Sequence, residues 1–373
     1  MSPHFLRKAI YSLPLSFTLI ACTLSSSIAQ TKVDKIAVAA DEGLLGNVKQ
    51  VKQEYFKAVN HFGEITTGEK DGSDSPMDKD NFFYAYNDSG VLIESKLYAI
   101  TGEMWQEVFN DSGQSLERSF YNSDGSLNIK QVYRYDEKGR SIEDDDYKAD
   151  GSLDEKTISK YDEKGNTIEV DGFKAGGVFY FKAIYEYDEK GNLIADIDLN
   201  EDGSRDRWQA YEFDEKGNQI KEILYDGEDT IGSIANWVYD EQGNVIETNQ
   251  YGADGTLWSK DVKKYNAQGK ITEFYEYDDI LNRNAIWIWK YNEAGKLIEF
   301  NKHNLDSSFV SKWTYGFDAK GHCIQKVIYL SDEIIDYTLT YQWEFDAQGN
   351  WTKKIISKNT VPVNIYVRTI TYY

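Results

Sequence analysis

Aromatic and polar positions alternate along most of this chain. Short stretches carry aromatic side chains two residues apart with a charged residue between them, as in Tyr133-Arg134-Tyr135 and Trp289-Lys290-Tyr291. A period of two places successive side chains on opposite faces of a β-strand. Each stretch therefore predicts a strand with one aromatic face and one polar face.

Each predicted strand runs into a turn that contains glycine. The clearest copies, at residues 161–166 and 187–192, read Tyr-Asp-Glu-Lys-Gly-Asn. The aspartate can accept hydrogen bonds from backbone amides, and the glycine can adopt a left-handed conformation. This glycine recurs every 26 residues, at Gly113, Gly139, Gly165, Gly191, Gly217, Gly243, Gly269, Gly295 and Gly321. A fixed period of this length indicates a tandem repeat.

A second turn follows about twelve residues after many of these glycines. It reads Asp-Gly-Ser or Asp-Gly-Thr at residues 124–126, 150–152, 202–204 and 254–256. Each unit then holds two short strands, and strands joined by short turns are antiparallel. We expect an isoleucine in the returning strand to pair with the aromatic residue before the turn, at Ile142, Ile168, Ile194, Ile220, Ile246, Ile298 and Ile324. The predicted fold is all-β, with tandem 26-residue hairpins in a long antiparallel meander.

The length of this meander predicts its shape. About twenty strands laid flat would extend roughly 95 Å, whereas open sheets rarely exceed about ten strands without curling. An uncovered aromatic face of that size would promote aggregation. We therefore expect the meander to curl with its aromatic face inward. The first interpretation of the aromatic residues is a packed core, and the second is a platform that binds a ligand.

The ends of the chain depart from the period. We expect a signal peptide over residues 1–29, a cap and polar loop over 30–82, the repeat array over 83–350 and capping strands over 351–373 that close the sheet edge. In the cap, Val48, Val51, Tyr55 and Val59 have helix-like spacing, but the β-branched residues around Thr66 favour a strand. The type of the cap is left open.

The N-terminal residues have the sequence features of an export signal peptide. Arg7 and Lys8 precede an apolar stretch that is too short to span a bilayer. Cleavage after Ala29 is one expected processing route, and lipidation of Cys22 in a lipobox-like sequence is the other. Both predict an extracytoplasmic protein in the periplasm, on the outer-membrane surface or secreted.

Charge narrows the range of partners. The formal net charge of −22 repels nucleic acid and anionic membrane surfaces. We expect no nucleic-acid partner, and membrane contact only through a lipid on Cys22. A polysaccharide or an envelope protein is the expected partner.

Two sets of residues are candidate binding sites. One stretch places oxygen ligands at positions 1, 3, 5 and 9 of an EF-hand-like calcium loop: Asp198, Asn200, Asp202 and Asp206. Gln209 stands at position 12 instead of the usual glutamate, and the stretch is in register with ordinary second turns of other units. Ca²⁺ is therefore the one cofactor considered. The other set is an aromatic platform for a glycan: Trp287, Trp289 and Trp313.

The turn motif resembles the YD repeat of the Rhs/YD-repeat family. It stands here at Tyr135-Asp136, Tyr161-Asp162, Tyr187-Asp188 and Tyr239-Asp240. The Asp-Gly-Ser/Thr turns are similar to part of MORN-type repeat variants, and such arrays resemble those of exported bacterial proteins. The resemblance implies a β-sheet rolled into a shell, with roles in carbohydrate binding, cell-surface contact or toxin encapsulation. This chain has a longer period than the usual YD unit.

The sequence lacks several common catalytic motifs. The sequence contains no His-Glu-x-x-His, Gly-x-Ser-x-Gly or P-loop motif, and its acidic residues fall in repeated turns. We therefore expect a non-enzymatic exported scaffold for binding or interaction at the bacterial envelope. A purely structural surface protein and a carbohydrate-active enzyme that uses turn carboxylates are the alternatives.

Overall fold

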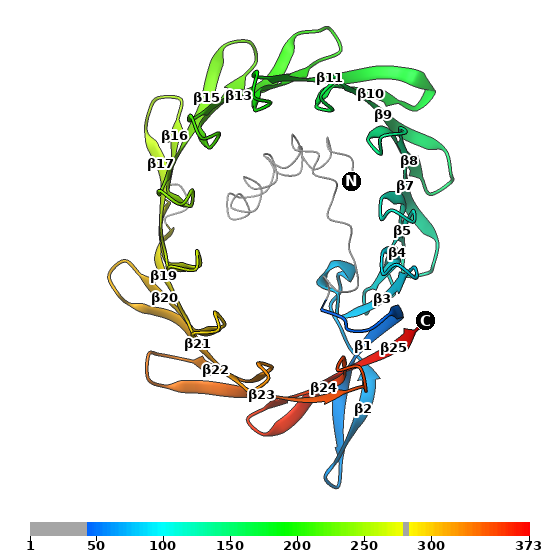
Figure 1. Cartoon of the computed structure of the whole chain (residues 1–373), viewed down its shortest axis with the longest axis vertical. Coiled ribbons are helices and arrows are strands. Elements are labelled where there is room, and N and C mark those ends of the chain that lie inside the picture. The colour runs from blue at the N-terminus through cyan, green and yellow to red at the C-terminus, as the bar shows by residue number, and fades with distance from the viewer. Residues whose placement is uncertain (1–42, 279–282) are drawn as a thin grey trace. The chain divides into compact units, whose positions relative to one another are not determined.

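Regular secondary structure is almost entirely β-strand in this protein, a computed structural model that describes residues 43–278 and 283–373 (Figure 1). These residues contain 25 strands, β1 to β25. They form two compact units: the first comprises the described residues up to Tyr180 together with Tyr341–Tyr373, and the second comprises Phe181–Thr340. The predicted all-β fold is confirmed.

The first unit is an antiparallel meander whose first strand pairs with the last. Neighbouring strands from β3 to β10 pair in sequence order, and β1 pairs with β2, β3 and β25. The strands are β1 (Val48–His61), β2 (Glu64–Lys70), β3 (Asn81–Tyr86), β4 (Leu92–Tyr98), β5 (Met104–Phe109), β6 (Ser115–Tyr121), β7 (Leu127–Tyr135), β8 (Ser141–Lys148), β9 (Leu153–Tyr161), β10 (Thr167–Lys174), β24 (Trp351–Lys358) and β25 (Val361–Tyr372). Two short 3-10 helices, η2 (Pro76–Asp78) and η3 (Ala175–Gly177), lie between strands.

The second unit continues the same pattern. Each strand from β11 to β22 pairs antiparallel with the next. The strands are β11 (Val178–Tyr187), β12 (Leu193–Leu199), β13 (Arg205–Phe213), β14 (Gln219–Asp226), β15 (Thr230–Tyr239), β16 (Val245–Gly252), β17 (Leu257–Tyr265), β18 (Ile271–Asp278), β19 (Arg283–Tyr291), β20 (Leu297–Asn304), β21 (Phe309–Phe317), β22 (Cys323–Tyr329) and β23 (Ile335–Phe345). The chain passes from one unit to the other within β11 and within β23.

The cap of uncertain type is a β-hairpin. Val48 and Val51 are both buried in β1 although they are three residues apart. The register with β25 shifts between Val48 and Gln50, which marks a β-bulge. The extra residue of a bulge brings side chains at odd spacing to one face, and this gives a strand the helix-like spacing seen in the sequence.

The last strand covers a sheet edge, as expected of the C-terminal segment. β25 pairs with β24 on one side and with β1 on the other, and Figure 1 shows β1 and β25 side by side. Ile365 in β25 is completely buried. The first and last strands thus pair with each other instead of presenting open edges. The inward direction of the aromatic face stays a prediction.

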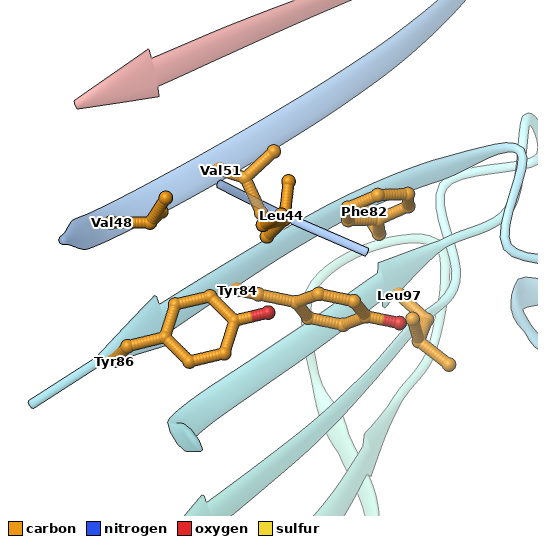
Figure 2. Close-up of a cluster of buried hydrophobic side chains, with 7 residues drawn as sticks. All are labelled: Leu44, Val48, Val51, Phe82, Tyr84, Tyr86 and Leu97. Carbon is orange, nitrogen blue, oxygen red and sulfur yellow. The ribbon is translucent and has the colours of Figure 1, made fainter. Parts of the chain in front are cut away.

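The main hydrophobic cluster lies beside this junction, and we call it the clasp. It consists of Leu44, Val48, Val51, Phe82, Tyr84, Tyr86 and Leu97, whose side chains gather between β1, β3 and β4 (Figure 2). Asn350 fastens the segment before β1, since its side chain accepts a hydrogen bond from Leu45 N at 2.7 Å and donates one to Leu45 O at 2.7 Å. Residues about 300 positions apart are therefore held together.

The isoleucine pairing expected from the sequence is wrong. Tyr135 lies opposite Ser141, and Tyr187 lies opposite Leu193, so the partner comes one residue before the isoleucine. The register shifts at this point, and the isoleucine falls at a β-bulge. Several of these isoleucines are more than a third exposed: Ile142, Ile168, Ile194 and Ile324.

Candidate functional site

The motif aspartate organises the turn in which it lies. Asp240 Oδ1 accepts hydrogen bonds from Gln242 N at 3.0 Å and Asn244 N at 2.8 Å, and its Oδ2 accepts from Asn244 Nδ2 at 2.9 Å. The hydrogen bond from the Asn244 side chain is the main cause that lowers the pKa of Asp240. Gly243 has a φ of 85°, the left-handed conformation expected for the fourth turn position. The aspartate is thus an ionised cap for backbone amides.

The motif tyrosine ties each unit to the preceding one. Tyr239 Oη donates to Gln219 O at 2.7 Å, and Tyr265 Oη donates to Val245 O at 2.7 Å. Each acceptor is the first residue after the preceding turn, twenty positions upstream, beside the bulge. The same bond recurs from Tyr135 and Tyr161 in the first unit and from Tyr291 in the second. The Tyr-Asp pair therefore has a structural role in both units.

The EF-hand-like stretch forms the second kind of turn. Gly203 N donates to Asn200 O at 3.0 Å, and Asp202 Oδ1 accepts from Ser204 N at 3.0 Å and Ser204 Oγ at 2.6 Å. Asp124, Asp150 and Asp306 make the same contacts with the serine two residues later.

The outer members of the proposed ligand set lie on strands. Asp198 in β12 is opposite Arg207 in β13, and Asp206 is at the bulge that follows this pair. In residues 43–278 and 283–373, no group of three or more His, Cys, Asp or Glu side chains is placed to hold a metal ion. Calcium binding by Asp198, Asn200, Asp202 and Asp206 stays a prediction.

The three candidate tryptophans meet on one face of four neighbouring strands, and we call this group the tryptophan row. Cross-strand pairs place Phe274 of β18 opposite Trp287 of β19, and Phe300 of β20 opposite both Trp289 and Trp313 of β21. Phe274 and Phe300 are buried, whereas the three tryptophans are partly exposed. The phenylalanines thus form the base on which the tryptophans rest.

The rings of the tryptophan row are stacked or tilted against one another. The rings of Trp287 and Trp289 are nearly parallel, at 9°, with centroids 6.3 Å apart. Phe300 and Trp313 stack with centroids 4.6 Å apart. Lys302 Nζ lies 3.9 Å from the Trp287 ring centroid and Lys326 Nζ lies 4.4 Å from that of Trp313. No cation of the described chain covers Trp289 in this way, which leaves its ring as the open one.

Carboxyl groups share the aromatic face, which the sequence analysis did not anticipate. Asp261 in β17 lies opposite Glu276 in β18, and Glu276 Oε2 accepts from Trp287 Nε1 at 3.3 Å. Burial is the main cause that raises the pKa of Asp261 to about 6. Burial also raises the pKa of Glu222 in β14 and of Asp144 in β8. Strict alternation from the aromatic residues across each hairpin could have placed these carboxyls on this face.

A hollow of about 910 Å³ lies at the edge of the second unit, between two first-type turns. Its lining includes Asp240, Gln242, Asn244, Lys263 and Asn266. The Asp240 carboxylate that borders it is already bonded within its own turn. The hollow is therefore bordered by polar side chains from two successive first-type turns.

Cys22 and the two predicted cleavage sites lie outside the described residues, so lipidation at Cys22 stays a prediction. No helix in the described part of the chain has the length and apolar character needed to cross a bilayer.

Comparisons with known proteins give remote structural likenesses. No family model and no curated protein matches the sequence. The TcdB2-TccC3-Cdc42 crystal structure is similar over 76% of this chain and 22% of that one, at 11% identity and a TM-score of 0.27. The Photorhabdus luminescens Tc holotoxin pore is similar over 81% of this chain and 20% of that one, at 13% identity and a TM-score of 0.28. A porin-like protein from Bacteroides uniformis is similar over 87% of this chain and 96% of that one, at 10% identity and a TM-score of 0.20. The chain spans about a fifth of the first two structures.

Proposed function

We propose that this protein is a non-enzymatic, extracytoplasmic repeat scaffold that binds a polysaccharide through the tryptophan row. The observation that supports this most is the pair of parallel, partly exposed rings of Trp287 and Trp289. A pyranose has an apolar face of C–H groups that packs on a flat aromatic ring, and partly exposed aromatic side chains suit such contacts. The exposed part of each ring is therefore a surface on which one sugar can pack.

Polar groups around these rings can bind sugar hydroxyls. Lys302 and Lys326 are donors beside the rings, and Glu276 is an acceptor at the edge of Trp287. An aromatic surface with a few polar groups at its border is the usual composition of a small-molecule site. Because Lys302 and Lys326 cover their rings, Trp289 is the ring on which a sugar packs first.

Binding is favoured over hydrolysis by the chemistry of the turns. A general acid for glycoside cleavage needs a raised pKa. The turn carboxylates of Asp188, Asp214 and Asp240 instead have lowered pKa values, chiefly because each accepts a hydrogen bond from the asparagine four residues later. The proposal includes export of the protein from the cytoplasm. It also includes a relationship of the turns to those of the Rhs/YD-repeat family.

A glycan array probed with the full chain tests this function. We expect retention on at least one polysaccharide, with Trp289→Ala weakening the affinity about tenfold, as loss of an aromatic anchor worth over 1 kcal/mol predicts. Trp208→Ala is the matched control, because Trp208 stacks on Tyr225 at 3.9 Å outside the row. Retention on no glycan by a folded chain, or equal losses in the two variants, would contradict the proposal.

A further inference from the structure

A second aromatic hollow lies on the opposite side of the same strands. It has a volume of about 460 Å³ and is lined by Trp258, Lys260 and Val262 of β17 and by Tyr275 and Tyr277 of β18. Tyr275 and Tyr277 alternate along β18 with Phe274 of the tryptophan row, so they face the other way. The volume is within the range of about 300–1,000 Å³ that holds small ligands.

The hollow exists because the repeat is broken at two positions. Trp258 is the extra residue of the bulge at the start of β17. Other units carry a smaller side chain or none at this position: Asn128, Asp154, Tyr180, Asp206, Gly232, Asn284 and Val310. Gly252 occupies a position that carries a larger side chain in other units, polar in most of them, as at Asn122, Lys148, Asn200 and Asp226, and apolar at Leu330. A Cβ on Gly252 would lie 2.7 Å from Trp258 Nε1 and 2.8 Å from Cε2. The glycine therefore lets the indole lie against the backbone of β16.

Two polar groups of this hollow make no hydrogen bond to the described part of the chain. They are the indole N–H of Trp258 and the hydroxyl of Tyr277, whose side chain is 38% exposed. The other polar groups are engaged, since Lys260 Nζ pairs with Glu247 Oε2 at 2.8 Å and Tyr275 Oη donates to Glu273 Oε2 at 2.6 Å. The hollow thus combines aromatic walls with one donor and one donor-acceptor that are unused.

We propose that the Trp258 hollow is a second binding site, which accepts one neutral hexopyranose at the end of a glycan. The apolar face of the sugar packs on the indole, and its hydroxyls bind the Trp258 N–H and the Tyr277 hydroxyl. The adjacent carboxylates Glu247 and Glu273 and the net charge of −22 disfavour an anionic sugar. The site does not depend on the tryptophan row.

Isothermal titration of the full chain with glucose, galactose, mannose and N-acetylglucosamine tests the site. We expect saturable binding of at least one of these sugars, about tenfold weaker in Trp258→Ala and several-fold weaker in Tyr277→Phe, which keeps the aromatic wall. Trp208→Ala, which lies outside both sites, should leave monosaccharide binding unchanged, and Trp289→Ala is titrated alongside to detect sugar bound at the tryptophan row. Circular dichroism identical to that of the wild type establishes that each variant is folded.

The outcomes separate the two sites. No saturable binding of any of the four sugars, or affinity unchanged in folded Trp258→Ala and Tyr277→Phe, overturns the hollow as a site whatever the array result for Trp289. Loss of monosaccharide binding in Trp289→Ala alone assigns the sugar to the tryptophan row and also overturns it. Loss of monosaccharide binding in Trp258→Ala, with retention on polysaccharide intact, supports the Trp258 hollow as a binding site. The tryptophan row is then tested by the glycan array alone.

Discussion

The clasp and the interior of the array are stabilised in different ways. In the clasp, Val48 and Val51 are each 1% exposed, and Ile365 in β25, opposite Phe56 of β1, is 0% exposed. In the array, large side chains remain partly exposed, such as Trp289 in the second unit and Ile194 after its turn. The clasp relies on buried apolar surface, and the array relies on backbone pairing and on repeated polar bonds.

The same contrast holds for sequence separation. Bonds between Asn350 and Leu45 join residues 305 positions apart, whereas the tyrosine tie from Tyr265 spans twenty positions. Units that contact only their neighbours gain stability additively along a repeat. We infer that the array tolerates local damage and that the clasp does not.

The largest expected effect is in β25, the strand that pairs with β1 beside the clasp. Ile365→Ala should lower the free energy of unfolding by about 2–5 kcal/mol, because it leaves a cavity at a fully buried position. Ile194→Ala in the array is the matched control and should cost below about 1 kcal/mol, since Ile194 is 36% exposed. Urea unfolding followed by tryptophan fluorescence measures both, and equal losses would break the comparison.

The second effect concerns Asp261, a carboxyl in the array, in contrast to Gln53, a buried neutral amide in β1 beside the clasp. Gln53 donates to Lys79 O and Asp80 O, whereas burial raises the pKa of Asp261 in β17 to about 6. A raised pKa favours the neutral acid in the folded state, so the stability that this group contributes is present below about pH 4 and is lost as the pH rises to about 6. About two pKa units at 1.36 kcal/mol each set an upper limit near 3 kcal/mol.

Asp261→Asn should therefore stabilise the protein by about 1–3 kcal/mol at pH 7 and by nothing at pH 4. Nearby charges act in both directions, since Lys263 lowers this pKa while Glu276 and Asp278 raise it. The control is Asp254→Asn, because backbone and side-chain bonds from Thr256 lower the pKa of this exposed turn acid. The midpoints of urea unfolding at pH 4 and pH 7 measure the stability of both variants. A gain in stability in the control equal to that in Asp261→Asn would contradict this prediction.

A smaller effect is expected in the turns of the array. Gly191→Ala should cost about 1–2 kcal/mol, because φ is +89° and an alanine in this left-handed conformation is strained although its Cβ meets no atom within 4 Å. Gly316→Ala in β21 should cost nothing or stabilise slightly, because its φ is outside the left-handed region and glycine weakens strands. Thermal unfolding of the two variants compares them, and a reversed order would refute the assigned turn.

The smallest effect tests a single tie between units. Tyr291→Phe removes the bond from Tyr291 Oη to Ile271 O, 3.0 Å long, and should cost about 0.5–1.5 kcal/mol. The reverse change, Phe317→Tyr, should create the equivalent bond to Leu297 O in the next unit. Hydrogen exchange of the flanking strands should become faster in the first variant and slower in the second. Unchanged exchange in both variants would show that the tyrosine hydrogen bond does not stabilise the contact between units.

The sequence predicted the strands of the array because two local signals coincide in each unit. Period-two alternation and the left-handed glycine of the Asp-x-x-Gly turn both depend on neighbouring residues alone. The pairing of Ile194 with Tyr187 was wrong because a bulge adds one residue after the turn. The same kind of bulge gave Val48 and Val51 helix-like spacing in a strand.

The candidate sites were only partly predictable. Trp287, Trp289 and Trp313 stood out by residue type, but the lysines over two of their rings come from strands whose register the sequence did not specify. Trp258 carries a signal of its own in the sequence, since the other units have smaller side chains at its position. Its significance depends on Gly252 in the adjacent strand.

The sequence by itself determined the repeating unit of this protein: two strands, two glycine turns, an aromatic face and an acidic surface. Those features follow from interactions within a few residues, which a linear pattern records. The tertiary structure decided that β25 pairs with β1, that Asn350 holds Leu45, and that Gly252 admits the Trp258 indole. These contacts depend on register and on which distant strands become neighbours, and no local pattern contains that information.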